Sequence, residues 1–147
     1  MSTVPRTELA PGYSISRMLK GGWQLAGGHG GIDRAAAIAD MSAYYQAGIT
    51  TFDCADIYTG VEELIGEFRR EHRARHGADS LAQLRVHTKF VPDLALLPSI
   101  DKQQVEQTID RSLRRLGVER LDLVQFHWWD YRVPRYVCLL YTSDAAD

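Results

Sequence analysis

The sequence has few cysteines, no excess of either charge and no long apolar run. Its only cysteines, Cys54 and Cys138, lie far apart among 147 residues. This spacing gives no disulfide framework and no metal-ligand pattern, so we expect no metal site and a reducing, cytoplasmic setting. Seventeen Lys and Arg against nineteen Asp and Glu leave a net charge of −2. Neither nucleic acid nor a membrane is therefore an expected partner, since no apolar stretch reaches the ~18 residues of a membrane-spanning helix.

The remaining composition is that of an ordinary globular protein, with 45% hydrophobic and 24% charged residues. The first eleven residues lack the apolar core of a signal peptide. Arginines cluster in 69–75 and 111–120, but acidic residues are interleaved with them, which predicts solvated helix faces. The length suits one domain and falls well short of the ~250 residues of a complete (β/α)₈ barrel.

Strand and helix patterns alternate along the chain. Asp33 as N-cap and Gly48 as terminator bound a first helix, and Val61 to Arg75 forms a second. Asp101 and Gln104 form a capping box for a third helix, which ends before Gly117. Strands are predicted at 15–25, 49–54, 85–90 and 121–127. This βαβαβαβ order is typical of a parallel sheet.

The predicted strands have one apolar face and one polar face. Phe52 faces opposite to Asp53, and Val86 faces opposite to Lys89. An open doubly wound sheet is buried on both faces, so its strands read as nearly continuous apolar runs. A barrel has helices outside and catalytic groups at the carboxyl ends of its strands. The sequence therefore favours an α/β fold, the N-terminal half of a TIM (β/α)₈ barrel, over a small four-stranded flavodoxin-like binding domain that the length also permits.

Four polar side chains stand at or just after the carboxyl ends of predicted strands: Asp53, Tyr58, Lys89 and His127. Each alone is commoner as a turn, packing, solvated or structural residue. A parallel sheet, however, brings these ends together along one edge. There an ammonium can favour tyrosinate, a carboxylate can hold the ammonium, and an imidazole can hold a carbonyl oxygen. Together the four can move a proton to or from the oxygen of a carbonyl or alcohol.

Four segments carry a resemblance to a known family. They are GGWQLAGG (21–28), TTFDCADIYTGVEELIGEF (50–68), VHTKF (86–90) and SLRRLGVERLDLVQFHWWD (112–130). In this order they resemble the aldo-keto reductases, and the resemblance covers residues 15–137. It implies a TIM barrel that uses NADP(H) to reduce a small-molecule carbonyl, an aldehyde or ketone, by hydride transfer.

The resemblance also implies roles for individual residues. Tyr58 would be the general acid, with Lys89 and Asp53 tuning it, and Asp53 would also contact the cofactor. His127 would orient the carbonyl of the substrate. Outside this catalytic set, Trp23 and Trp128 would help to wall the substrate pocket. The sequence carries no sign of the oligomeric state.

The resemblance to the family stops near Val137. We expect residues 1–14 to be a lead-in, 15–137 a partial reductase domain, and 138–147 a foreign tail that resembles translated adapter sequence. A half barrel would leave its first and fourth strands as open edges. We therefore expect the isolated chain to be marginally stable and inactive. A non-catalytic regulatory or binding member of the same barrel family is the alternative.

Overall fold

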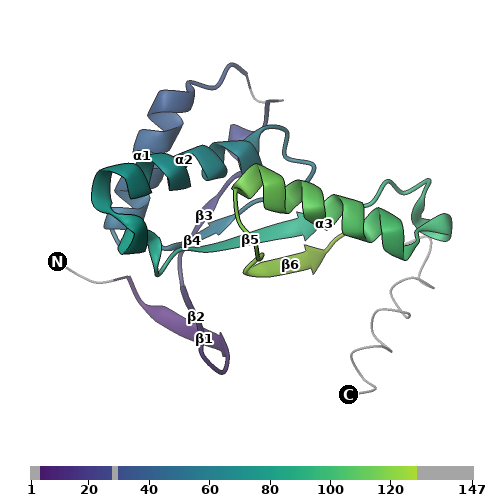
Figure 1. The fold of residues 1–147 in the computed structure, drawn as a ribbon, viewed down its shortest axis with the longest axis horizontal. Helices are drawn as coiled ribbons and strands as arrows, with labels where there is room; N and C mark the ends of the chain where they lie inside the picture. The colour runs from purple at the N-terminus through teal and green to yellow at the C-terminus, as the bar shows by residue number, and fades with distance from the viewer. Residues whose placement is uncertain (1–3, 28–29, 129–147) are drawn as a thin grey trace.

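The computed structural model describes residues 4–27 and 30–128, where a parallel sheet carries helices on one face (Figure 1). The expected tail at 138–147 lies outside these residues. The strands of the sheet are, in spatial order, β3 (Leu19–Gly21), β4 (Thr51–Asp53), β5 (Arg85–Phe90) and β6 (Leu123–Phe126). The helices are α1 (Arg34–Gln46), α2 (Val61–His76) and α3 (Lys102–Leu116), with short 3₁₀ turns at η1 (Trp23–Leu25), η3 (Ala78–Leu81) and η4 (Leu97–Ser99).

The strand order distinguishes the two predicted folds. Neighbours in the sheet follow one another along the chain, so the order never reverses. A doubly wound sheet reverses its order at a switch point and puts helices on both faces. The partial barrel is thus confirmed, and the flavodoxin-like alternative is wrong.

A single hydrophobic core fills the space between the sheet and the helices. Phe52 and Val86 point from the sheet toward Phe68 and Leu64 of α2 and Met41 of α1, and all are buried. The predicted alternation holds, because Asp53 of β4 and Lys89 of β5 point to the opposite face of the sheet. That face is the one a closed barrel would enclose.

A β-hairpin lies on the other side of the sheet from the helices, formed by β1 (Arg6–Ala10) and β2 (Tyr13–Ser16) (Figure 1). The prediction of one strand over 15–25 is therefore wrong, since β2, β3 and η1 divide this segment. Ser16 explains the break: its Oγ accepts hydrogen bonds from the backbone N–H groups of Thr50 and Thr51 and donates to the Met18 carbonyl. The hairpin escaped the sequence pattern because every residue of β1 is exposed.

The helix ends form where the sequence predicts them. Asp33 accepts a hydrogen bond from the Ala36 N–H at 3.0 Å. Asp101 and Gln104 form the reciprocal capping box, with distances of 2.9 and 3.0 Å. Gly117 ends α3 with φ of +64°, a left-handed conformation that glycine adopts without a Cβ penalty. None of the described helices combines the length and apolarity needed to span a membrane.

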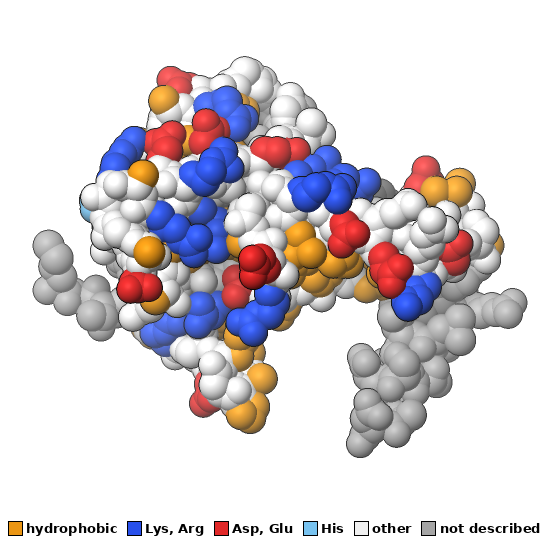
Figure 2. All heavy atoms as spheres, viewed as in Figure 1, with side chains coloured by type: hydrophobic (Ala, Val, Ile, Leu, Met, Phe, Trp, Pro, Cys, Tyr) orange, Lys and Arg blue, Asp and Glu red, His pale blue; other side chains and the backbone are white. Residues whose placement is uncertain are grey.

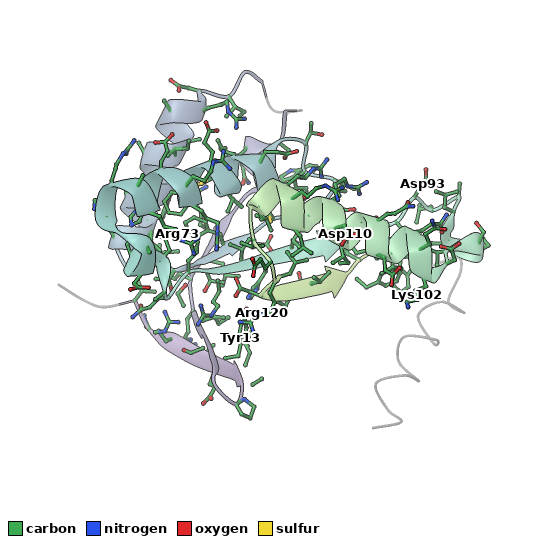
Figure 3. All side chains as sticks on the ribbon, in the orientation of Figure 1. Tyr13, Arg73, Asp93, Lys102, Asp110 and Arg120 are labelled. Carbon is green, nitrogen blue, oxygen red and sulfur yellow. The ribbon has the colours of Figure 1, made fainter. Side chains whose placement is uncertain are left out.

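Two of the arginines assigned to solvated faces are partly buried. Arg115 forms ion pairs with the fully buried Glu62 and with Glu63, and Arg69 is only partly exposed. The prediction is wrong for these two. On the outer face of α3, by contrast, Lys102 and Asp110 point away from the core (Figure 3). Basic and acidic side chains are mixed over the face of the molecule shown in Figure 2.

The packing of α2 against α3 yields a first prediction. A Cβ at Gly66 would lie 2.3 Å from the carbonyl oxygen of Arg115. Helix propensity alone would make alanine better by about 1 kcal/mol. The backbone clash reverses that sign, so Gly66→Ala should lower the free energy of unfolding by roughly 1–3 kcal/mol in urea titrations.

Gly31 supplies the control, because a Cβ there meets no atom within 4 Å. Gly31→Ala should change stability by less than about 0.5 kcal/mol. An unchanged or higher stability of Gly66→Ala would show that the helices are not in this close contact.

Candidate active site

An ion pair joins the carboxyl ends of the two central strands. Lys89 Nζ lies 2.8 Å from both carboxylate oxygens of Asp53 and donates a third hydrogen bond, also 2.8 Å, to the carbonyl of Cys54. The side chain of Lys89 is 15% exposed and that of Asp53 is 30% exposed. An ammonium with three acceptors is fully satisfied, so its position at this edge of the sheet is fixed.

Tyr58 lies on the loop that follows β4, directly beside this ion pair. Lys89 Nζ is 5.3 Å from the centroid of the Tyr58 ring, and the indole of Trp23 meets the same ring edge-on at 5.0 Å. The phenol ring thus contacts both a cation and an aromatic side chain. Positive charge placed there stabilises negative charge that develops on the phenolic oxygen.

These groups open into one cavity of about 260 Å³. Its lining residues are Trp23, Ala55, Ile57, Tyr58, Lys89, Val91 and His127. His127 follows β6 and is tied to β5 through its backbone N–H, which donates to the Phe90 carbonyl at 3.0 Å. The structure thus brings Tyr58, Lys89 and His127 to the same cavity, with Asp53 fixed to Lys89 beside it.

The two tryptophans differ in placement. Trp23 lines the cavity, as the expected wall of a substrate pocket would. Trp128 is not among the lining residues, and its ring packs against Phe126 at 5.0 Å. Since Phe126 belongs to β6, Trp128 extends the apolar contacts of that strand, and its role as a pocket wall stays a prediction.

Asp56 anchors the loop that carries Tyr58, and the sequence interpretation missed it. Its carboxylate accepts hydrogen bonds from the Val91 N–H at 3.1 Å and from Arg111 at 3.2 Å, while its own N–H donates to the Lys89 carbonyl at 3.1 Å. Burial raises the pKa of Asp56, opposed by the Val91 hydrogen bond and the Arg111 charge. The signal was available in FDCADIY, where a second acidic residue stands two positions before the tyrosine.

A buried polar chain supports the site from the helical side. The carboxylate of Glu62 accepts hydrogen bonds from the Thr88 hydroxyl at 2.7 Å and from Arg115 at 3.2 Å. Arg115 also donates to the backbone carbonyl of Asp56 at 3.0 Å. Because Thr88 precedes Lys89 in β5, these hydrogen bonds link α2 and α3 to the strand that ends in the site.

His87 and Cys54 are buried near the ion pair but have other surroundings. His87 Nε2 lies 3.0 Å from the hydroxyl of Tyr13, which the hairpin places against this face. Burial lowers the pKa of His87, while the charges of Asp53 and Asp122 oppose that effect. Burial raises the pKa of the Cys54 thiol to about 12, so this thiol stays protonated and unreactive. No cluster with metal-ligand composition occurs in residues 4–27 and 30–128.

Comparison with known proteins gives a family match. The model of the Aldo/keto reductase family matches residues 17–146. The chain belongs to the aldo/keto reductase family. The match begins in the short connection between β2 and β3 and includes every strand of the parallel sheet.

Curated aldo-keto reductases resemble this chain over most of its length. YhdN of Bacillus subtilis is 30% identical over an alignment of 129 residues, which covers 84% of this chain and 37% of that protein. AMT2 of Alternaria alternata is 29% identical over an alignment of 126 residues, which covers 70% of this chain and 34% of that protein. The chain therefore spans little more than a third of the length of these relatives.

Solved aldo-keto reductase structures share the fold. An aldo-keto reductase (AKR2E5) complexed with NADPH superposes with a TM-score of 0.69 at 26% identity, over 86% of this chain and 36% of the other. AKR2E5 of the silkworm, Bombyx mori, gives 0.66 at 25% identity, over 86% and 37%. The parallel sheet and its helices thus correspond to part of an aldo-keto reductase barrel.

The ion pair of this aldo-keto reductase chain yields a second prediction. Lys89→Met leaves the Asp53 carboxylate without its cation, which should lower the free energy of unfolding by roughly 1–3 kcal/mol in urea titrations. Adding Asp53→Asn should restore part of that loss, because the uncompensated charge is removed. Strictly additive effects of the two substitutions would contradict a direct interaction.

The buried imidazole yields a third prediction. Because the pKa of His87 is lowered by folding, the unfolded chain binds that proton first as pH falls below the ordinary value of 6.5. Stability contributed by neutral His87 is thus present at higher pH and is lost as pH falls through this range. His87→Gln should show a smaller loss of unfolding free energy between about pH 7.5 and 5.5 than the parent chain. An identical pH dependence would place His87 in a setting like that of the unfolded chain.

Proposed function

We propose that the protein carrying this chain is an NADP(H)-dependent oxidoreductase that reduces aldehydes or ketones to alcohols, with Tyr58 as general acid. One observation carries the proposal: Tyr58, Lys89 and His127 line one cavity, and Asp53 holds Lys89 in place. Nothing in the packing of the sheet requires these four residue types together. Membership of the aldo/keto reductase family supports the same assignment.

The proposed chemistry follows from the contacts of each side chain. A carbonyl oxygen in the cavity gains negative charge as hydride reaches its carbon, and Tyr58 donates a proton to that oxygen. Lys89 stabilises the phenolate that remains, since its ammonium lies beside the ring. Asp53 keeps that ammonium directed at the site. His127 donates a hydrogen bond that orients the carbonyl, and Trp23 excludes water from the phenol edge.

The residues at the cavity fit the reactive end of a nicotinamide cofactor. The cavity joins an apolar wall to a proton donor and a fixed cation, a donor set suited to hydride transfer onto a carbonyl. NADPH, when bound, supplies the hydride. Asp53 keeps a partly exposed carboxylate at this edge, and we propose it as a cofactor contact. An aldo-keto reductase neighbour is described as complexed with NADPH.

Catalysis on this proposal draws on more than the described residues. The chain covers a little over a third of its curated relatives, so the reaction belongs to a domain that contains it. We propose that the 147-residue chain alone does not turn over substrate. A cytoplasmic location also stays a proposal.

The fourth prediction tests the general acid. In a protein that joins this chain to a complete family domain, Tyr58→Phe should lower kcat for carbonyl reduction about 10²- to 10⁴-fold, because the proton donor is lost. The affinity for NADPH should change little. Tyr44→Phe is the matched control, since Tyr44 lies exposed on α1 and should leave kcat unchanged.

Two results would redirect the proposal. Near-native turnover of Tyr58→Phe would refute its role as acid. Binding of NADPH by the parent protein without any carbonyl reduction would favour the non-catalytic alternative, a regulatory or binding member of the same family.

A further inference from the structure

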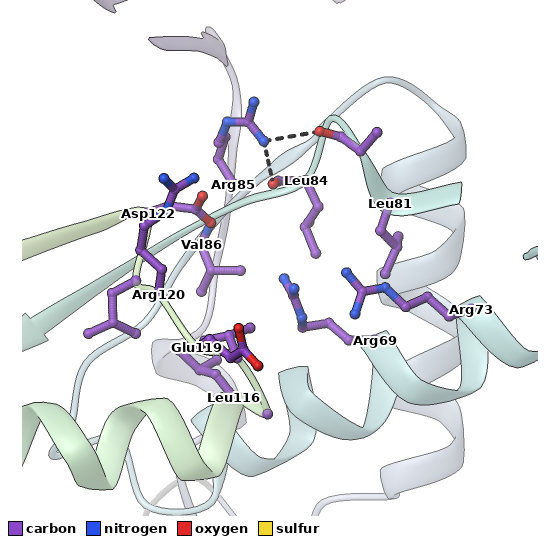
Figure 4. Close-up of a pocket in the computed structure, with 14 residues that line it drawn as sticks. Arg69, Arg73, Leu81, Leu84, Arg85, Val86, Leu116, Glu119, Arg120 and Asp122 are labelled. Atoms are coloured by element: carbon purple, nitrogen blue, oxygen red, sulfur yellow. Dashed lines mark hydrogen bonds between the residues drawn. The ribbon is translucent and has the colours of Figure 1, made fainter. Parts of the chain in front are cut away.

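A larger cavity lies at the opposite end of the sheet from the candidate active site (Figure 4). Its volume is about 500 Å³, within the range of small-molecule pockets. Arg85 and Val86, which line it, begin β5, whereas Lys89 lies toward the far end of that strand, roughly 13 Å away at the usual rise. Asp122, immediately before β6, also lines it. The cavity is therefore separate from the proposed site of carbonyl reduction.

Positive charge predominates in the lining. Four arginines (Arg69, Arg73, Arg85 and Arg120) face two carboxylates (Glu119 and Asp122). Figure 2 shows several Lys and Arg side chains, with acidic side chains between them, on the part of the surface where Figure 3 labels Arg73 and Arg120. This surplus contrasts with the net charge of −2 for the whole chain.

Some of the lining charges are already engaged. Arg85 donates to the carbonyl oxygens of Ala82 and Leu84 at 3.1 and 2.9 Å. One oxygen of Asp122 accepts from the Val86 N–H at 2.9 Å. These contacts fix the walls of the cavity and leave Arg69 and Arg73 of α2, together with Arg120, as the lining cations that form no ion pair within the described residues.

Arg69 and Arg73 stand one turn apart on α2 and project side by side into the cavity (Figure 4). Neither forms an ion pair within the described residues. The Nε of Arg69 is buried, and no hydrogen-bond partner for it occurs in that part of the chain. Burial lowers the pKa of Arg69, the Arg73 charge lowers it further, and Asp122 acts in the opposite direction. Two like charges facing one hollow, one of them with a buried unsatisfied donor, cost free energy that an anion would recover.

We propose that this cavity binds the phosphoryl group of a small anion between the guanidinium groups of Arg69 and Arg73. Planar guanidinium groups match phosphate oxygens with paired, charge-assisted hydrogen bonds. The cavity has room for substituents beyond the phosphoryl group, since its volume is that of a small-molecule site. The proposal is independent of the reductase function, because none of its residues lines the other cavity.

The test is a calorimetric titration of the 147-residue chain with inorganic phosphate at constant ionic strength. We expect saturable binding at one site. Arg69→Gln and Arg73→Gln should each weaken the affinity about tenfold or more, the loss of a charge-assisted contact. Arg70→Gln is the control, because Arg70 lies exposed on the same helix outside the cavity. The phosphate affinity of this variant should equal that of the parent chain.

A second titration with glucose 6-phosphate separates a free ion from a phosphorylated molecule. Tighter binding than inorganic phosphate would place the substituent in the remaining volume, and equal affinity would assign the site to phosphate itself. Since Arg73 is exposed, Arg73→Gln should retain the parent circular dichroism spectrum and keeps the test valid if Arg69→Gln unfolds. Absence of saturable binding by the parent, or equal losses in all three variants, would overturn the proposal.

Discussion

The ion pair between Lys89 and Asp53 is the interaction on which the candidate active site depends. Parallel pairing aligns Asp53 with His87, so the lysine stands two residues further along its strand and must reach back across the gap. It does so with three short hydrogen bonds, one of them to the backbone at the start of the loop that carries Tyr58. One ammonium thereby fixes two strand ends and lies against the phenol that we propose as the acid.

The opposite face of the sheet reinforces this arrangement with a different set of charges. Buried Glu62 is partnered by Thr88 and Arg115, and the Asp56 carboxylate accepts hydrogen bonds from the Val91 N–H and from Arg111 of α3. A buried carboxylate is tolerated only when its hydrogen bonds are satisfied, so these contacts specify how the helices sit on β5. The site is consequently held on the polar face of the sheet by the Lys89–Asp53 ion pair and on the helical face by the hydrogen bonds of Glu62 and Asp56.

Much of this arrangement could be predicted from local signals. Helix caps depend on one or two side chains near the helix end, and Asp33 and the Asp101–Gln104 box form as expected. The alternation of polar and apolar residues in β4 and β5 correctly indicated a sheet with one apolar face against the helices and one polar face. A motif of catalytic residue types at the strand ends, read with the family resemblance, placed Tyr58 and Lys89 at one cavity.

The features that escaped prediction depend on distant contacts. The hairpin strand β1 has no buried residue, so it carries no periodic signal. Arg115 resembles its solvated neighbours in sequence, and only the tertiary approach of α2 at Gly66 brings it to Glu62.

The central claim is that Tyr58 and His127 meet the oxygen of a bound carbonyl at the cavity that Lys89 and Asp53 organise. A crystal structure of a complete domain containing this chain, with NADP⁺ and a carbonyl ligand, measures this directly. We expect the carbonyl oxygen to lie within hydrogen-bond distance of the Tyr58 hydroxyl and the His127 imidazole, with the Lys89 ammonium still paired with the Asp53 carboxylate. A carbonyl bound away from both groups would contradict it.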